Sequence, residues 1–349
     1  MKILFLSKDM SCYKAAMYQN EIIDEISRQA DVRLFCPRDE MKDVINIDQI
    51  IKDIQFVPEF IFVGHSWLSD NYEGEIENFP YIKIKDSKIP KAIFLNKEYV
   101  RLEDKLDWIR ENRFLLAFSH HHNISYYERR SLTKFYFIPF AFDSKKIKKL
   151  SKTNKVFDLS FSGILQNKNL GASQSDIRKK VMKEIFHTFC NIPIIKKKKY
   201  QKLSIFWNSI PDRILCVRIS QLIAKYRRLD DNEYFEMQKK TKVFFNSPSP
   251  IGIVSPRIFE NMACKCLPLC SESESYYEVF TRGSIVTFKD DLSDFGQKLS
   301  FLLENEKQID KIIRKNFNEV YKKHTWKIRI NSLMKILEKS ITAKMEDMC

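Results

Sequence analysis

Short apolar runs alternate with amphipathic stretches along the first part of the chain. The apolar runs lie at residues 2–7, 31–37, 59–67, 91–96, 113–119 and 134–142, and they have the continuous apolar character of strands buried on both faces. Apolar residues at helical spacing occupy 13–29 and 102–111. Buried strands separated by helices predict a parallel sheet that helices cover on both sides.

The same pattern restarts after a polar, basic segment, DSKKIKKLSKTNK, at residues 143–155. Strands are expected over 156–163, 239–250, 266–271 and 284–289, and helices over 175–190, 292–305 and 307–339. We therefore expect a first Rossmann-like domain over 1–148, a ligand-binding domain over 149–325, and a last helix over 326–349 that crosses back to the first domain. The predicted fold class is α/β, with two doubly wound domains that face each other and a ligand cleft between them.

Length and composition fit this organisation and exclude several classes. The 349 residues are 44% hydrophobic, which is enough for two cores. The seven glycines match neither G-x-G-x-x-G nor G-x-x-x-x-G-K, so a dinucleotide fingerprint and a P-loop are both absent. The eight cysteines form no C-x-x-C pair and are expected to be buried apolar residues rather than metal ligands. No signal peptide or long apolar run occurs, which favours a cytoplasmic location.

The net charge of +15 is concentrated in one block. Residues 196–228 carry ten basic side chains against Asp212 alone, which suggests an anionic partner such as a membrane face, a nucleic acid or a phosphorylated substrate. The alternative is a solvated, lysine-rich surface. Within this block, residues 209–228 have apolar positions at helical spacing between basic ones. They predict an amphipathic helix that either lies on the inner face of an anionic membrane or packs on the second domain.

The stretch SPRIFE, residues 255–260, carries the most specific chemistry. Ser255 is a favoured N-cap and Pro256 suits the first helical position, so a helix with free N–H groups is expected to begin here. Arg257 adds a planar donor for phosphate oxygens, and Glu260 can accept the two hydroxyls of a ribose. The alternative is that Glu260 is only an acidic residue near a helix N-terminus, paired with Arg257.

The stretch SPRIFENMACKCLPLCSESESYYEVF, with HTW some 60 residues later, resembles the carboxy-terminal half of GT-B glycosyltransferases. The nearest resemblance is to the group-1-type branch, including CgeB-like spore maturation proteins. It covers about residues 134–336 well and the N-terminal half in outline. The resemblance implies that Glu260 holds the nucleotide ribose and that Ser255, Pro256 and Arg257 face the pyrophosphate.

Three positions depart from that family pattern. A second glutamate, common eight positions before Glu260, is replaced by Gly252, and the usual glycine after M-A-C is Lys265. The basic pair that binds phosphates after the first strand of the second domain has no clean match. In the loop after Gly163, Lys168 is the basic candidate, and Arg178 follows in the next helix.

The sequence lacks a D-x-D motif, which favours a site that uses no metal and no cofactor beyond a nucleotide-sugar co-substrate. The resemblance implies retention of anomeric configuration more than inversion. On the acceptor side, His65, Lys97, Glu98 and His120 follow predicted strands and are candidates for a general base or sugar contacts. The alternative for His65 and His120 is that each is an ordinary surface or core histidine with no role in the reaction.

These observations predict a glycosyltransferase that moves a sugar from a nucleotide diphosphate to a glycan, lipid-linked or protein acceptor. It would be cytoplasmic, or peripheral at the inner face of a membrane. The alternatives are a nucleotide-sugar epimerase of the same fold, a nucleic-acid-modifying glycosyltransferase, and an inactive glycosyltransferase-like binding protein.

Overall fold

The computed structural model describes residues 1–7, 18–36, 45–64, 82–148, 153–164, 172–186, 204–210, 222–225, 229–247 and 249–346. Its contacts divide the chain into two compact units. The first unit comprises Met1–Phe140 and Trp326–Cys349, and the second comprises Ala141–Thr325. The final helix therefore packs with the N-terminal half, and the basic segment after Phe142 belongs to the second unit.

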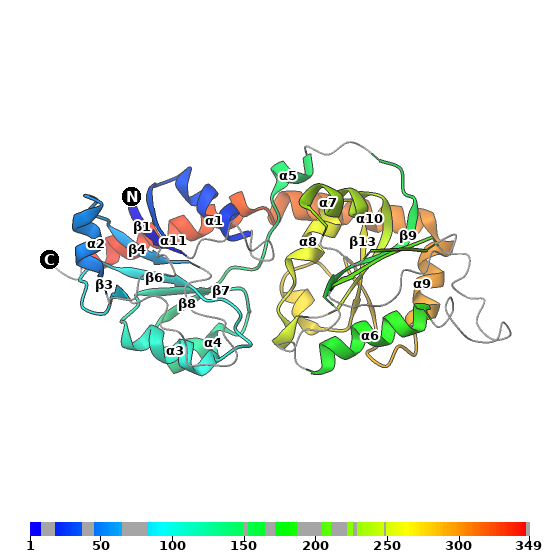
Figure 1. Ribbon diagram of the computed structural model, residues 1–349, viewed down its shortest axis with the longest axis horizontal. Helices are drawn as coiled ribbons and strands as arrows, with labels where there is room; N and C mark the ends of the chain where they lie inside the picture. The colour runs from blue at the N-terminus through cyan, green and yellow to red at the C-terminus, as the bar shows by residue number, and fades with distance from the viewer. Residues whose placement is uncertain are drawn as a thin grey trace. The chain divides into compact units, whose positions relative to one another are not determined.

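The first unit is a parallel six-stranded sheet between helices (Figure 1). The strand order is β2-β1-β4-β6-β7-β8, and a separate two-stranded sheet pairs β3 with β5. The strands are β1 (Lys2–Leu6), β2 (Asp31–Phe35), β3 (Ile45–Asn46), β4 (Phe60–Val63), β5 (Ile82–Lys83), β6 (Lys91–Phe94), β7 (Leu116–Ser119) and β8 (Lys134–Phe137). The helices are α1 (Tyr18–Ser27), α2 (Ile47–Asp53), α3 (Leu102–Glu111), α4 (Ile124–Ser131) and α11 (Trp326–Glu346).

Alternation along the central strands explains why both faces of this sheet are covered. Leu4 and Leu6 of β1 enter a core that includes Leu106 and Ile109 of α3. Phe5 points to the opposite face, where its ring stacks on Phe62 of β4 with centroids 5.1 Å apart. On that face lie α1 and α11, which contact each other (Figure 1). The continuous apolar runs of the sequence thus contribute side chains to two cores, one on each side of the sheet.

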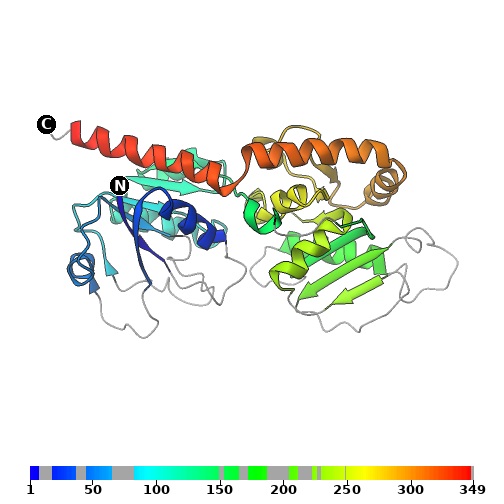
Figure 2. The same ribbon diagram turned by 90° about the horizontal axis from the view of Figure 1, so that it is seen from above.

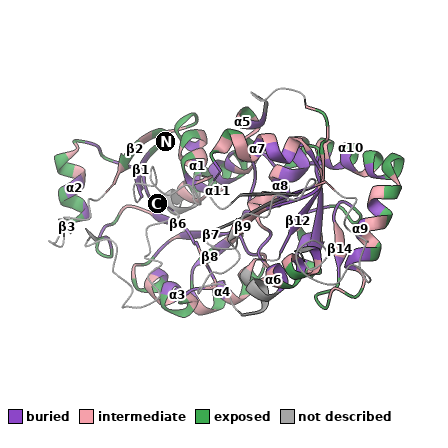
Figure 3. Cartoon of the chain, turned by 45° about the vertical axis from the view of Figure 1, so that its right-hand side comes forward, coloured by how far each residue is buried: buried purple, intermediate pink, exposed green. Residues whose placement is uncertain are grey.

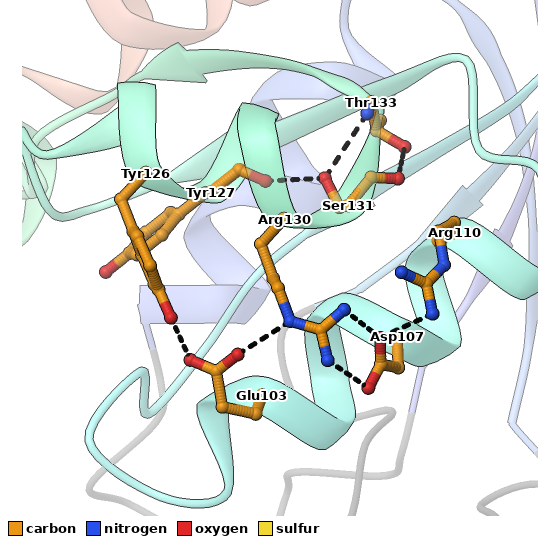
Figure 4. A network of polar contacts seen from close by, with 8 residues as sticks. All are labelled: Glu103, Asp107, Arg110, Tyr126, Tyr127, Arg130, Ser131 and Thr133. Carbon is orange, nitrogen blue, oxygen red and sulfur yellow. Dashed lines mark hydrogen bonds and ion pairs between the residues drawn. The ribbon is translucent and has the colours of Figure 1, made fainter.

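A polar network joins α3 to α4 on the outside of the first unit (Figure 4). Arg130 of α4 donates to Glu103 at 2.9 Å and to Asp107 at 2.6 Å, both on α3. The hydroxyl of Tyr126 donates to the same Glu103. Because these groups are largely solvent-accessible, we assign the network a role in fixing the two helices side by side rather than in chemistry.

The second unit is also a parallel six-stranded sheet, with the order β11-β10-β9-β12-β13-β14. The strands are β9 (Phe157–Ile164), β10 (Ile205–Ile210), β11 (Leu222–Lys225), β12 (Thr241–Asn246), β13 (Leu267–Ser271) and β14 (Val286–Phe288). The helices are α5 (Ser144–Lys148), α6 (Ala172–Phe186), α7 (Asp231–Lys239), α8 (Pro256–Ala263), α9 (Phe295–Glu304) and α10 (Glu306–Lys323), with short 3-10 helices η2 (Pro250–Gly252) and η3 (Glu274–Glu278).

Buried side chains of α6 and α9 form one core with the sheet, around Phe161, Phe245 and Phe288. Residues of α7 pack on the opposite face, where Met237 meets Phe206 and Phe244. Both predicted parallel sheets, and nearly all of the predicted elements on described residues, are confirmed. The helical stretch predicted over 307–339 is divided into α10 and α11, which are separated at His324 and Thr325.

The predicted helix over 209–228 is wrong, because Ile205–Ile210 and Leu222–Lys225 are neighbouring parallel strands. Strand β10 lies between β9 and β11, and Ile205 is fully buried. The described residues of this segment therefore belong to strands and not to one amphipathic helix: Ser209 and Ile210 lie in β10, and Leu222–Lys225 form β11. Most of the basic block 196–228 lies outside the described residues. No helix among the described residues is long and apolar enough to cross a membrane.

Candidate functional site

The centre of the second sheet is a topological switch point. From β9 the chain passes to β10 on one side, whereas β12, its neighbour on the other side, leads on to β13. In parallel α/β sheets, ligands bind beyond the carboxyl ends of strands at such a point. Strand β9 ends with Gly163 and Ile164, β12 is followed by Ser247, and η2 then leads into α8. The residues of interest lie on these segments.

Helix α8 begins at the residues that the sequence predicts. Ser255 is the N-cap, with φ −62° and ψ 140°, and its Oγ accepts the backbone N–H of Arg257 at 3.4 Å. Pro256 occupies the first turn, where a missing N–H costs nothing. Ile258, Phe259 and Met262 are buried and hold the helix on the sheet. The first turn of α8 is therefore fixed by its cap and by its apolar face.

The guanidinium of Arg257 lies against the end of β9. A Cβ atom placed on Gly163 would come within 3.3 Å of Arg257 Nη2 and 3.0 Å of Phe161 Cζ. The Arg257 guanidinium carbon is 6.0 Å from the centroid of the Phe161 ring, a cation–π distance. A glycine at 163 thus leaves the space in which Arg257 approaches the strand end.

A second guanidinium, that of Arg178 on α6, is directed to the same strand ends. Arg178 is 8% exposed, and its Nε donates to the Oγ of Ser247 at 2.6 Å. The pKa of Arg178 is lowered to about 9. Burial is the main cause, and the positive charge of Arg257 is the second. Two cations are therefore held near one another at the switch point, an arrangement that an anion between them would stabilise.

Glu260 lies one helical turn beyond Arg257. Its Oε2 accepts the hydroxyl of Tyr234, on α7, at 3.0 Å. Burial raises the pKa of the Glu260 carboxyl, while Tyr234, Arg257 and Lys146 act in the opposite direction. Glu260 is partly exposed, and Tyr234 fixes one of its oxygens. An N-terminal turn that carries Arg257 and a carboxylate hydrogen-bond acceptor are thus presented by the same helix.

Two of the three departures from the family pattern, those at Gly252 and Lys265, have conformational reasons. Gly252 has φ +78°, and a Cβ there would come within 2.8 Å of Ser275 Oγ, so a glutamate does not fit this turn. Lys265 adopts φ 54°, the left-handed conformation that glycine favours after a helix. Its Nζ lies 4.7 Å from the centroid of the Phe317 ring. The turn after α8 therefore keeps its left-handed geometry with a lysine in place of glycine.

The acceptor-side candidates of the first unit follow β6 and β7. Glu98 is 1% exposed; it accepts hydrogen bonds from Ser119 Oγ at 2.9 Å, the His120 N–H at 3.1 Å and Tyr127 Oη at 2.8 Å. Burial has the largest influence on the Glu98 carboxyl and raises its pKa to about 7. Lys97 is partly exposed and has φ 39°. The structure thus brings Lys97, Glu98 and His120 together at the ends of neighbouring strands.

His120 is enclosed by aromatic rings. Its own ring stacks on Phe140 with centroids 3.7 Å apart, and Phe94 lies 4.5 Å away. Nδ1 donates to the carbonyl oxygen of Ile138 at 2.7 Å. Burial lowers the pKa of His120 to about 3, so its imidazole stays neutral at physiological pH.

Two predicted site residues, His65 and Lys168, lie outside the described residues. Three residues that the sequence did not single out as ligands lie near Arg257 and Glu260 or are linked to them: Arg178, Tyr234 and Ser247. Arg178 could have been weighed more heavily as a basic residue in the first helix after β9, whereas nothing in the sequence connects Tyr234 to Glu260. Among the described residues, no cluster of three or more His, Cys, Asp or Glu side chains is placed to hold a metal ion.

Comparisons with known proteins agree with this architecture. Residues 196–335 match the model of a family described as glycosyl transferase-like. Sucrose-phosphate synthase from Thermosynechococcus elongatus is similar in structure, with a TM-score of 0.65 and 10% identity over 98% of this chain and 100% of that chain. An E. coli trehalose-6-phosphate protein bound with UDP-2-fluoro glucose has a TM-score of 0.66 and 8% identity, over 97% and 99% of the two chains.

Anabaena HepE, in complex with UDP and glucose, has a TM-score of 0.57 and 12% identity, over 97% of this chain and 99% of that chain. No curated protein sequence matches this chain. At such identities the likeness establishes the fold, which is the GT-B arrangement of two parallel-sheet α/β units. The family match classes residues 196–335, most of the second unit, as glycosyl transferase-like, which supports the predicted class of enzyme.

Proposed function

We propose that the chain is a glycosyltransferase that takes its sugar from a nucleoside diphosphate, with UDP as the favoured nucleotide. The observation that carries this proposal is the grouping of Arg178, Arg257 and Glu260 at the switch point of the second sheet. Similar structures such as HepE were solved with UDP and glucose, which supports the choice of nucleotide. SPRIFENMAC and HTW favour the group-1-type, CgeB-like branch within this class.

Each of these groups has a distinct role in the proposed mechanism. Glu260, positioned by Tyr234, accepts the ribose hydroxyls. Arg257 and Arg178, together with the free N–H groups of the first turn of α8, bind the diphosphate. As the bond to the sugar breaks, negative charge grows on the departing diphosphate, and fixed cations stabilise it without reorganising. We therefore propose a transfer that needs no metal. The resemblance to the family supports the further proposal that configuration is retained.

The acceptor is proposed to be a glycan, a lipid-linked saccharide or a protein, received by the first unit. Lys97 is partly exposed at the end of β6 and is the candidate for direct contact. Glu98 and His120 are buried beside it, so we propose that they act on the acceptor by positioning the loops that carry Lys97. His65 remains the proposed general base on the sequence pattern alone.

A thermal-shift screen of the full chain against UDP, GDP, ADP and their sugars tests the donor site. We expect UDP or a UDP-sugar to raise the melting temperature, and Glu260→Ala to lose most of this rise. Glu272→Ala, which removes an exposed carboxyl of the same unit, is the control. If no nucleotide stabilises the chain, the enzyme assignment fails, and equal stabilisation of the Glu260 variant would remove Glu260 from the site.

Arg178→Met gives an independent readout. The variant removes one of the two neighbouring cations and its hydrogen bond to Ser247, while Arg257 and Glu260 stay in place. Its affinity for UDP should fall by about tenfold to a hundredfold, as expected for a lost hydrogen bond to a charged group. Unchanged affinity would exclude Arg178 from the diphosphate site.

Product analysis separates transfer from related chemistry. Incubation with a UDP-sugar should release UDP, slowly to water and faster with an acceptor, and an excess of EDTA should leave the rate unchanged. A free epimerised sugar nucleotide would instead indicate an epimerase. Binding of UDP with no release in any condition would indicate an inactive binding protein.

A further inference from the structure

Helix α10 (Glu306–Lys323) carries a basic face that the donor site does not use. At about 100° per residue, Lys307, Lys311, Arg314, Lys315 and Lys322 fall within an arc of about 100°, and Asn318 is the other residue in that arc. All five basic side chains are exposed. The opposite side of the helix is buried through Ile309, Ile313 and Val320, so the orientation of the arc toward solvent is fixed. Figure 2 shows α10 along the outside of the second unit, and Figure 3 shows exposed and buried residues along it.

No acidic side chain of α10 lies within this arc. Glu306 lies outside the arc and forms an ion pair with Lys242 at 2.9 Å. Asp310 also lies outside the arc, four positions before Arg314, and can offset the charge of that arginine. Glu319 is buried and accepts hydrogen bonds from Thr281 and Ser284. Among the described residues, the five basic side chains therefore face solvent without a carboxylate between them.

We propose that this basic face of α10 docks the chain on a bilayer that contains anionic phospholipids. The eighteen-residue helix is about 27 Å long, so its cations are spread along a convex line that suits an extended anionic surface better than one small ligand. The arc offers no aromatic side chain on which a base could stack, which makes single-stranded nucleic acid a poorer partner. It also offers no apolar side chain for insertion, so attachment is electrostatic and should weaken with salt.

This docking is independent of the donor site and does not require the proposed activity. The test is sedimentation of the full chain with vesicles of phosphatidylcholine alone or with about a quarter phosphatidylglycerol. The wild type should bind only the anionic vesicles. The variant Lys311→Gln, Arg314→Gln, Lys315→Gln should bind them at least about tenfold more weakly, since each basic residue contributes to attraction by the anionic surface.

A matched control removes the same charge elsewhere. Lys52, Lys83 and Lys85 are exposed lysines of the first unit, and their replacement by Gln should change vesicle binding by less than about twofold. Melting temperatures verify that both variants fold; the α10 variant removes like-charge pairs within the arc together with the favourable spacing of Arg314 from Asp310. The proposal is overturned by wild-type vesicle binding in the α10 variant, by an equal loss in both variants, or by binding of these residues to duplex DNA and not to vesicles.

Discussion

The buried carboxyl of Glu98 should make the stability of the first unit depend on pH. Glu98 is enclosed at the ends of β6 and β7, where Ser119, His120 and Tyr127 donate hydrogen bonds to it. Burial nevertheless dominates and raises its pKa from 4.5 to about 7. The proposed perturbation is Glu98→Gln, which keeps the shape and a hydrogen-bond acceptor but removes the titration.

Proton linkage gives the direction in which the stability of the first unit changes with pH. Between pH 4.5 and about 7, the folded state keeps a proton that the unfolded state has released. The stabilisation is therefore fully present below pH 4.5 and is lost as pH rises through about 7. A shift of this size corresponds to about 3 kcal/mol in total, of which about 2.5 kcal/mol falls between pH 5 and pH 8.

His120 opposes this trend in the wild type. Burial lowers its pKa from 6.5 to about 3, so its contribution is present above pH 6.5 and is lost as pH falls toward 3. Between pH 4.5 and 6.5 the contribution of Glu98 to stability falls with pH while that of His120 rises, and the two nearly cancel. The effect of Glu98 is therefore measured as the difference in stability between the wild type and Glu98→Gln.

Urea unfolding of both proteins at pH 5, 6, 7 and 8 measures this difference. Three of the four tryptophans, at positions 67, 108 and 326, belong to the first unit, so intrinsic fluorescence mainly follows that unit. The stability of Glu98→Gln relative to the wild type should rise by about 2.5 kcal/mol from pH 5 to pH 8. Glu111→Gln, an exposed carboxyl of the same unit, controls for the lost charge. A difference that stays constant with pH would refute the reasoning, because it would mean that Glu98 is ionised throughout.

Two further predictions concern the second unit. Tyr234→Phe removes the hydrogen bond to Glu260, so KM for the sugar nucleotide should rise by about tenfold with little change in kcat, and the acid limb of its pH profile should move to higher pH. An unaltered KM and acid limb would contradict a positioning role for Tyr234. Lys265→Gly should be about 1 kcal/mol more stable than Lys265→Ala by urea unfolding, because both lose the contact with Phe317 but only alanine keeps a Cβ at φ 54°. Equal stabilities would mean that this conformation carries no strain.

The periodicity of the sequence predicted the two sheets because most strands are recognisable from the apolar residues of their own short run. The KILFL run of β1 and the TKVFFN run of β12 are apolar on both faces, and only a strand covered on both sides accommodates that. The helix predicted over 209–228 is wrong at residues 209–210 and 222–225, because short apolar runs fit a helix or a strand equally well and pairing with neighbouring strands decides between them. The α8 cap was predicted for the same local reason, since Ser255 and Pro256 act on their own turn.

The sequence grouped Arg257 with Glu260 because the two residues share one helix, and their role in binding stays a prediction. Arg257 and Glu260 are three positions apart, whereas Arg178 meets Ser247 across 69 residues and Tyr234 meets Glu260 across 26. Such pairs depend on how the helices are set on the sheet, which no local pattern encodes. The aromatic surroundings that keep His120 neutral have the same origin, because they include Phe94 and Phe140 from different segments.

The position of α8 is itself fixed by a buried polar network. Asn246 Nδ2 at the end of β12 donates to Asn261 Oδ1 at 2.8 Å, and Asn261 Nδ2 donates to Gln238 Oε1 of α7 at 2.7 Å. All three side chains are fully buried, where a broken hydrogen bond is costly, so β12, α7 and α8 are held in one arrangement. Because Tyr234 is on α7 and Glu260 on α8, the same network sets the distance between them. The carboxylate and the first turn of α8 are therefore placed before a ligand arrives, and binding need not provide the free energy of ordering them.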